Sequence, residues 1–223
     1  IVKAATLFTY VALNLCFPIK WIVKPTVYKQ FCGGETIEEC KSVIEAMAKY
    51  NVKTILDYSV EEKESPEDIE AALEETLRTI ENAGKDKNIP FAVFKPTAFA
   101  RSKTLEKASS DQKMTDDEHA EVIQFRSRIN TLCDTAFKND LPILIDAEEV
   151  CYQYIIDEVA REMMKKYNRE KAIVFNTLQM YRWDRLDFLK QEVEVARKDG
   201  FQYGAKFVRG AYMEKERKWA QKY

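Results

Sequence analysis

The chain has 223 residues, of which 46% are hydrophobic and 32% charged, a composition typical of a globular protein with a substantial core. Its 35 basic and 37 acidic residues nearly cancel, so no overall positive field attracts nucleic acid, and we expect no nucleic-acid partner. The presence of a single histidine, His119, excludes a histidine-rich zinc centre and any catalytic triad built on several histidines.

The five cysteines indicate reduced thiols rather than a disulfide framework, because they are odd in number, widely spaced and free of any CxxC pair. We therefore expect an intracellular protein. The chain begins with Ile1 rather than Met, which favours a processed, trimmed or partial chain.

Residues 1–51 are expected to form an N-terminal helical segment. Residues 4–19 carry no charge, but this stretch is shorter than the roughly 20 apolar residues of a membrane-spanning helix. We expect one or two helices packed on the main domain. An alternative is an interfacial helix that gives peripheral membrane association, since Lys20 and Lys24 lie close by. A further helix is predicted over residues 36–50, with Thr36 as its N-cap.

From residue 52 to residue 223 the sequence alternates between short apolar runs and helical patterns. Two helix starts are marked by capping residues, Ser65 followed by Pro66, and Thr115 followed by Glu118. Five such units in strict alternation predict a parallel sheet with helical crossovers. The predicted strands cover residues 54–59, 91–95, 143–146, 172–177 and 204–209.

Every predicted strand delivers polar residues at its carboxyl end, where a (β/α)8 barrel builds its active site. A doubly wound sheet would instead carry a glycine-rich phosphate turn, and no GxGxxG or GxxxxGK[ST] motif occurs. Taken alone, Asp146 and Glu148 could equally cap the next helix, and Lys95 could be a solvated strand end. Their convergence favours a site. The residues concerned are Asp57, Lys95, Asp146, Glu148, Gln179, Tyr181, Lys206, Arg209 and Tyr212.

Five segments carry a resemblance to a known family. They are residues 56–61 (LDYSVE), 94–97 (FKPT), 144–149 (LIDAEE), 175–181 (FNTLQMY) and 206–212 (KFVRGAY), the last being the most specific. In this order and at these strand positions they resemble the proline dehydrogenase family, over roughly residues 30–223. The resemblance implies an α/β fold, a (β/α)8 TIM-type barrel of which about five β/α units are present, preceded by N-terminal helices.

The resemblance also implies an activity. In that family FAD at the carboxyl face of the barrel takes a hydride from C5 of L-proline, which gives pyrroline-5-carboxylate, and the electrons pass to a quinone. Fixed cations stabilise negative charge on a reduced flavin, and a cationic group binds the substrate carboxylate. The expected cofactor is therefore FAD, and the expected partners are L-proline and a quinone acceptor.

Roles carried over from the family fall on ten positions. Lys95 is matched to the lysine that helps bind the substrate carboxylate, and Asp146 to the acid of the substrate pocket. Glu61 is matched to an acid that pairs with an arginine and closes the site. The residues matched to the proline ring are Ala211 and Tyr212, and those matched to the flavin are Gln179, Lys206, Val208, Arg209 and Gly210, with Lys206 close to its reacting edge.

Two departures from the family pattern bear on these roles. Some members carry Arg-x-Val-Lys where this chain has Lys206-x-Val-Arg209, and a planar fork and a point charge bind differently. The sequence also stops soon after the fifth predicted strand, so the sixth to eighth strands and the terminal arginine pair of the family are not in it. One alternative is consequently a catalytically incompetent half barrel that acts as a structural or interaction subunit. Another is a different barrel enzyme, such as an aldolase with Lys95 as its Schiff-base amine.

The expected location is cytoplasmic or peripheral on an inner membrane, with the mitochondrial inner membrane as the alternative. The sequence makes no prediction of oligomeric state.

Overall fold

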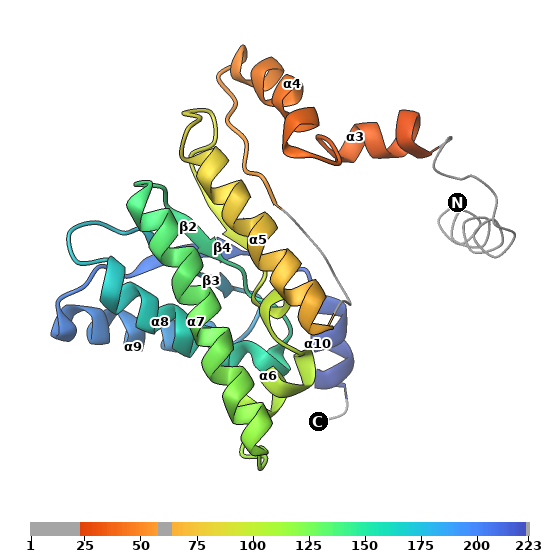
Figure 1. Cartoon of the computed structure of the whole chain (residues 1–223). Coiled ribbons are helices and arrows are strands. Elements are labelled where there is room, and N and C mark those ends of the chain that lie inside the picture. Colours follow the sequence, from red (N-terminus) through yellow and green to blue (C-terminus); the bar gives the residue numbers. More distant parts are fainter. Residues whose placement is uncertain (1–22, 58–63, 222–223) are drawn as a thin grey trace, which may run out of the picture. The chain divides into compact units, whose positions relative to one another are not determined.

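In the computed structural model, residues 23–57 and 64–221 are described, and the chain divides into two compact units, Ile1–Lys53 and Thr54–Tyr223 (Figure 1). The uncharged stretch at residues 4–19 lies outside the described residues. The first unit holds the π-helical turn η1 (Lys24–Tyr28), α3 (Lys29–Phe31) and α4 (Ile37–Ala48). The predicted cap of α4 is confirmed, because Thr36 Oγ1 accepts a 3.1 Å hydrogen bond from the Glu39 amide.

The second unit is built on a sheet of four parallel strands, in the order β1-β2-β3-β4. They are β1 (Ala92–Phe94), β2 (Ile143–Ile145), β3 (Val174–Gln179) and β4 (Gly204–Val208). Strand order equals chain order throughout, whereas a doubly wound sheet reverses its order at a switch point. Because crossovers between parallel strands are right-handed, this order places every crossover helix on the same face of the sheet, as in a barrel.

The first predicted strand, residues 54–59, is not formed where it is described. Residues 54–57 contain no strand, and the Thr54 amide donates to the Asn88 carbonyl at 3.0 Å. Ile55 remains 45% exposed, whereas a strand of a parallel sheet needs both faces covered. The described residues thus contain four strands rather than the predicted five.

The helices of the second unit begin and end close to the predicted signals. Ser65 Oγ accepts from the Asp68 amide at 3.1 Å, and Thr115 and Glu118 form the predicted capping box. Gly200 ends α9 with a positive φ of 69°. Two helices were not predicted, α6 and α10. The helices are α5 (Pro66–Ala83), α6 (Ser102–Ala108), α7 (Asp116–Lys138), α8 (Gln153–Tyr167), α9 (Arg185–Asp199) and α10 (Met213–Ala220), with the 3-10 turns η2 (Pro96–Phe99) and η3 (Val150–Tyr152).

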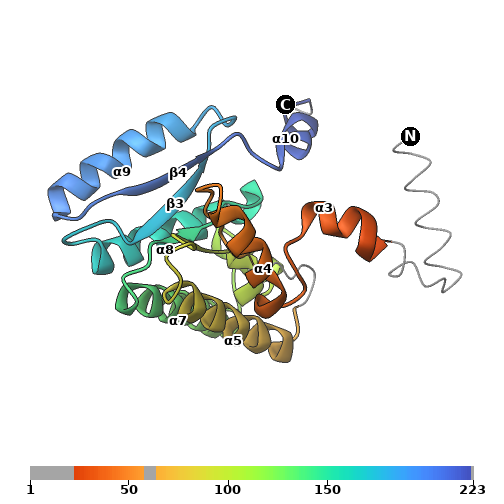
Figure 2. The ribbon, with the colours of Figure 1, turned by 90° about the horizontal axis from the view of Figure 1, so that it is seen from above.

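The crossover helices cover one face of the sheet. α5 packs on α7 and α7 packs on α8, and Figure 2 shows α5, α7, α8 and α9 following one another around the strands. Asn176 of β3 points to this face, because its Nδ2 donates to Asp157 of α8 at 2.9 Å. Through the register Phe94–Ile145–Asn176, Phe94 and Ile145 share that face, and both are 2% exposed. Alternate residues must therefore point to the opposite, inner face.

The amino ends of β3 and β4 are held together by one buried side chain, Asn168, which follows α8 and is fully buried. Its Oδ1 accepts from the amides of Ile173 and Val174 at 2.9 and 2.8 Å. Its Nδ2 donates to the carbonyls of Val174 and Gln202 at 2.8 and 2.9 Å. All of the hydrogen-bonding capacity of the Asn168 amide oxygen and nitrogen is thereby used at this end of the sheet.

Candidate active site at the carboxyl ends of the strands

Four polar side chains form a row across the inner face of the sheet, at the carboxyl ends of its strands. The register pairs Thr177 with Lys206 and Ile145 with Asn176, so that Asp146 falls beside Thr177. Continued by one residue, the pairing of Phe94 with Ile145 places Lys95 beside Asp146. We call Lys95, Asp146, Thr177 and Lys206 the polar row. Since their side chains point to one face, two strands and the residues that directly follow the other two bring them together.

Asp146 is the centre of the polar row. Its Oδ1 accepts from Lys206 Nζ at 2.5 Å and from Thr177 Oγ1 at 3.4 Å. The Asp146 and Lys206 side chains are 21% and 30% exposed. Removing either partner would leave the other charge partly buried without its counter-ion, which is costly. Asp146 therefore fixes the Lys206 ammonium on the inner face.

Lys95 leaves β1 toward the same end of the sheet. Its Nζ lies 3.5 Å from Asp57 Oδ2, and the Lys95 and Asp57 side chains are 24% and 40% exposed. The contact is long for a charge-assisted hydrogen bond. Asp57 thus contributes one weak contact to the Lys95 ammonium.

Gln179, predicted in the loop after β3, is the last residue of that strand and is 2% exposed. Its Nε2 donates to the carbonyl of Glu148 at 2.8 Å, and Val208 lies opposite it in the register. Glu148 is itself 5% exposed, and burial raises the pKa of its carboxyl. The loop after β2 is thus linked directly to the end of β3.

The segment after β4 carries the remaining predicted residues. Arg209 and Ala211 are exposed, while Val208, Gly210 and Tyr212 are half-buried. Gly210 has φ +104°, and a Cβ at this position would overlap the ring of Tyr181. Only glycine fits a backbone that is both left-handed and this close to an aromatic ring. Gly210 and Tyr181 therefore couple the loop after β3 to the loop after β4.

Two polar atoms next to this contact are buried without a partner among the described residues, Tyr181 Oη and Arg182 Nη1. Burial raises the pKa of Tyr181. Buried polar groups are nearly always hydrogen-bonded. Two such atoms without a partner beside the carboxyl ends of the strands therefore indicate a place where a further group binds.

Among the predicted site residues, Glu61 lies outside the described part of the chain. Lys95, Asp146, Gln179 and Lys206 come together at one end of the sheet, as the strand pattern indicates. Thr177 was missed, although its position two residues before Gln179 on a strand places both on one face. Glu148 was noted at a strand end but was not assigned to the site.

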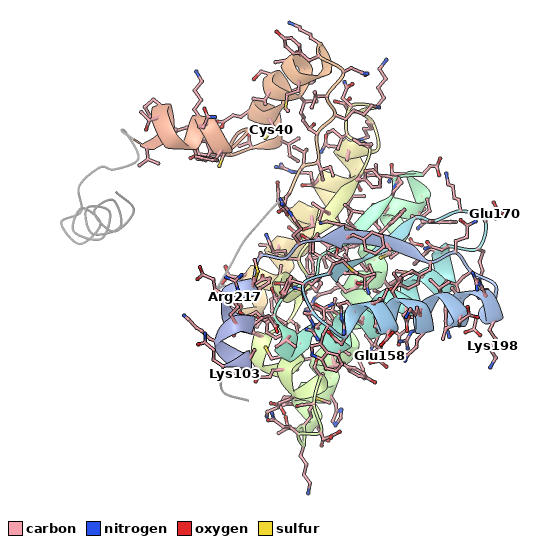
Figure 3. The ribbon with its side chains drawn as sticks, turned by 180° about the vertical axis from the view of Figure 1, so that it is seen from behind. Cys40, Lys103, Glu158, Glu170, Lys198 and Arg217 are labelled. Atoms are coloured by element: carbon pink, nitrogen blue, oxygen red, sulfur yellow. The ribbon has the colours of Figure 1, made fainter. Side chains whose placement is uncertain are left out.

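The two ends of the sheet carry different groups. Figure 3 shows Lys103 of α6 and Arg217 of α10 at one end, and Glu170 and Lys198 at the other. The polar row lies at the carboxyl ends, which lead into α6 and α10.

No cluster of three or more His, Cys, Asp or Glu side chains that could hold a metal occurs in residues 23–57 and 64–221. No helix within those ranges is long and apolar enough to cross a membrane.

A parallel sheet in chain order, with cations and carboxylates gathered at its carboxyl ends, defines part of an α/β barrel of the enzyme type. The chain belongs to the proline dehydrogenase family, since the family's sequence model, described as proline dehydrogenase, matches residues 40–223.

Curated relatives agree with this membership. The chain is 31% identical to proline dehydrogenase 1, mitochondrial, of Dictyostelium discoideum over 249 residues, which covers 94% of this chain and 44% of that protein. It is 32% identical over 188 residues to the carbapenem antibiotics biosynthesis protein CarD of Pectobacterium carotovorum subsp. carotovorum, covering 84% of this chain and 50% of that protein. The chain thus spans about half the length of the curated relatives it matches.

The fold agrees with that of solved structures. Proline utilization A (PutA) from Bdellovibrio bacteriovorus, inactivated by N-propargylglycine, superposes with a TM-score of 0.72 at 18% identity, covering 87% of this chain and 21% of that chain. PutA from Corynebacterium freiburgense gives a TM-score of 0.64 at 15% identity, over 81% of this chain and 18% of that chain. The second unit is therefore part of a TIM-type barrel, as predicted.

Proposed function

We propose that this chain carries part of the active site of a flavin-dependent proline dehydrogenase, which oxidises L-proline to pyrroline-5-carboxylate. The observation that carries the proposal is the polar row, in which Lys95, Asp146 and Lys206 gather at the carboxyl ends of the strands. The chain that carries this row belongs to the proline dehydrogenase family. Four of the predicted segments, residues 94–97, 144–149, 175–181 and 206–212, reach this one end, although they are far apart in the sequence.

The substrate side of the site is assigned to the residues nearest Lys95. We assign the Lys95 ammonium to the proline carboxylate, because it is a cation at the carboxyl end of β1 and a carboxylate substrate needs a cationic partner. Asp146 shapes the pocket and orients the Lys206 ammonium through its 2.5 Å contact. Ala211 and Tyr212 follow β4 and line the proline ring, and Glu61 closes the site.

The flavin side is assigned to the ends of β3 and β4. The donor set fits a flavin, because two cations, Lys206 and Arg209, and the side-chain amide of Gln179 could donate to the oxygen and nitrogen acceptors of such a ring system. Tyr181 Oη and Arg182 Nη1 are buried donors that still need an acceptor. Val208 and Gly210 contribute backbone groups beside Gln179 and Tyr181. FAD, when bound, supplies the hydride acceptor of the reaction.

This chain's own residues orient the reactants. Lys206 would supply a fixed positive charge that stabilises negative charge on a reduced flavin. Asp146 holds that ammonium in place before the reaction, so no reorganisation of the charge is needed during it. Exclusion of water from the closed site strengthens both effects.

The test is anaerobic reduction of the full natural chain by L-proline. The purified protein should show a flavin absorption spectrum, and L-proline should bleach it. Lys206→Met should slow this bleaching by about a hundredfold, as expected for loss of one preorganised charge at the reacting group. Lys198→Met is the matched control, since Lys198 is exposed near the end of α9, at the other end of the sheet (Figure 3).

A flavin that L-proline leaves oxidised in the wild-type protein would contradict the proposal. So would a Lys206→Met variant that is bleached as fast as the Lys198→Met control.

For the electron acceptor we propose a quinone, with location at the mitochondrial inner membrane. Relatives from Dictyostelium discoideum and Homo sapiens are named as mitochondrial proline dehydrogenases, which supports the mitochondrial alternative over a cytoplasmic one.

A non-catalytic interaction subunit is the second candidate. The observation that favours it is the edge of the sheet, where β4 pairs only with β3 among the described strands and Phe207 is 59% exposed. An unpaired edge is a template for pairing with another chain. The bleaching experiment separates the two candidates.

A further inference from the structure

A buried carboxylate stands next to the polar row without belonging to it. Glu148, in the loop after β2, is 5% exposed. Its two carboxylate oxygens accept from the Thr97 amide at 2.9 Å and from Thr97 Oγ1 at 2.6 Å. Both bonds go to the same residue of another loop, so the Glu148 side chain ties the loop after β1 to the loop after β2.

The backbone of Glu148 adds two further links. Its carbonyl accepts from Gln179 Nε2 at 2.8 Å, and its amide donates to Gln153 Oε1 at 3.0 Å. Gln179 is the last residue of β3, and Gln153 is the first residue of α8. One residue thus joins the carboxyl ends of three neighbouring strands to a helix.

The helix layer anchors this junction. Gln153 Nε2 donates to Asp157 Oδ1 at 3.0 Å, and Asp157 Oδ2 accepts from Arg185 Nη1 of α9 at 2.6 Å. Gln153, Asp157 and Arg185 are 2%, 5% and 8% exposed. A buried hydrogen-bonded network of this kind is rigid, so Glu148 cannot move without breaking contacts in the layer below.

Rigidity at Thr97 is passed to Lys95. Only Pro96 separates the two, and its ring fixes its own φ and restricts the backbone of Lys95 before it. The Ala98 amide also donates to the Lys95 carbonyl at 3.1 Å. A tether on Thr97 therefore sets the direction in which Lys95 leaves β1.

Packing alone does not require a carboxylate here. Burial raises the pKa of Glu148, and a buried charged group is often no more stabilising than an apolar side chain of the same volume. The Glu148 carboxylate instead fixes the orientation of Thr97, since its two oxygens accept from the amide and the hydroxyl of that residue.

We propose that Glu148 is a positioning residue for the site. Its carboxylate aims Lys95 at the substrate carboxylate through Thr97, and its carbonyl fixes the Gln179 amide at the end of β3, where we assign the flavin. The inference rests on the proposed function, because it names a residue that acts through Lys95 and Gln179.

The test uses the full natural chain with its flavin, and measures steady-state kinetics with L-proline together with visible circular dichroism of the bound flavin. The variants are Glu148→Gln, Thr97→Val and the double variant. Glu170→Gln is the matched control, because it removes an exposed carboxylate at the amino ends of the strands (Figure 3).

Thr97→Val removes one donor to the carboxylate and should raise the KM for L-proline roughly threefold to tenfold, with the flavin dichroism unchanged. Glu148→Gln places an amide nitrogen, itself a donor, opposite one of the two donors of Thr97. It should raise KM about tenfold, change kcat less than threefold, and alter the flavin dichroism through Gln179. Because both changes break one contact, the double variant should resemble Glu148→Gln alone.

A merely structural role would lower the melting temperature and leave KM and the dichroism of the folded protein unchanged. That result in Glu148→Gln, or an unchanged KM in Thr97→Val if Glu148→Gln does not fold, overturns the inference. Additive effects in the double variant overturn it as well. A wild-type protein that L-proline does not reduce overturns the proposed function itself, so the two failures are distinguishable.

Discussion

The exchange of cations around β4 changes what each position can do. Lys206 meets Asp146 Oδ1 with a single ammonium at 2.5 Å, inside the row formed with Thr177. A guanidinium at that position could engage both carboxylate oxygens of Asp146 in one plane, whereas the ammonium meets Oδ1 alone. The fork is instead at Arg209, an exposed residue just after the strand. The point charge is thus held in the inner row, and the planar donor is placed at the rim.

At the residue scale, Gly210 makes the sharpest prediction. Gly210→Ala should lower the free energy of unfolding by about 3 kcal/mol or more, because the new methyl group combines a left-handed backbone with overlap of the Tyr181 ring. Gly200→Ala is the control. Gly200 also has a positive φ, but only Arg169 lies near it, so the cost should be about 1 kcal/mol. Chemical denaturation of the full natural chain measures both, and equal losses would contradict the predicted overlap.

Single residues of the site show which contacts could be predicted from the sequence and which could not. The strand ends predicted that Lys95, Asp146 and Lys206 gather, because the period of two and the parallel order leave few alternatives. The link from Gln179 to the carbonyl of Glu148 could not be predicted, since a backbone acceptor leaves no trace in the side-chain pattern. Residues 54–57 were wrongly assigned to a strand because an apolar run does not reveal whether its second face is covered.

At the scale of elements, charge holds the start of α9 to the turn that precedes it. Asp184 precedes the helix and accepts from Arg182 at 3.0 and 2.8 Å and from Arg185 at 3.2 and 2.6 Å. Burial alone would raise the pKa of Asp184, but these hydrogen bonds outweigh it and hold the pKa well below its usual value of 3.8. The folded chain therefore binds the proton less tightly than the unfolded chain.

The sign of the resulting pH dependence follows from that lowered pKa. The contribution of Asp184 to stability is present above about pH 4 and is lost as the pH falls further. Asp184→Asn should lower the free energy of unfolding by about 1–2 kcal/mol at neutral pH, and the difference from wild type should shrink in acid. Urea denaturation at neutral and acidic pH measures it. Asp187→Asn, whose carboxylate is 74% exposed, should have little effect at either pH. A difference for Asp184→Asn that stays constant with pH would contradict the assignment.

At the scale of the whole molecule, the central strands of the sheet have more neighbouring strands than its edge strands. β2 and β3 each have a strand on both sides, whereas β4 has only β3 among the described strands. In residues 1–223 studied alone, amide hydrogen exchange should be slowest in β2 and β3 and faster in β4, because an edge strand opens without disrupting the core. Protection of β4 equal to that of β3 would mean that another chain covers the edge, and sedimentation at the same concentration would then show an assembly.

Asn168 has a consequence for how this scaffold tolerates change. It joins β3 to β4 through the carbonyls of Val174 and Gln202, at the end of the sheet opposite the polar row. Strand register is thus set by a part of the molecule that takes no part in chemistry. The loops that follow β3 and β4 can accordingly be exchanged for those of other family members in chimeric proteins, with the alignment of the two strands preserved by Asn168.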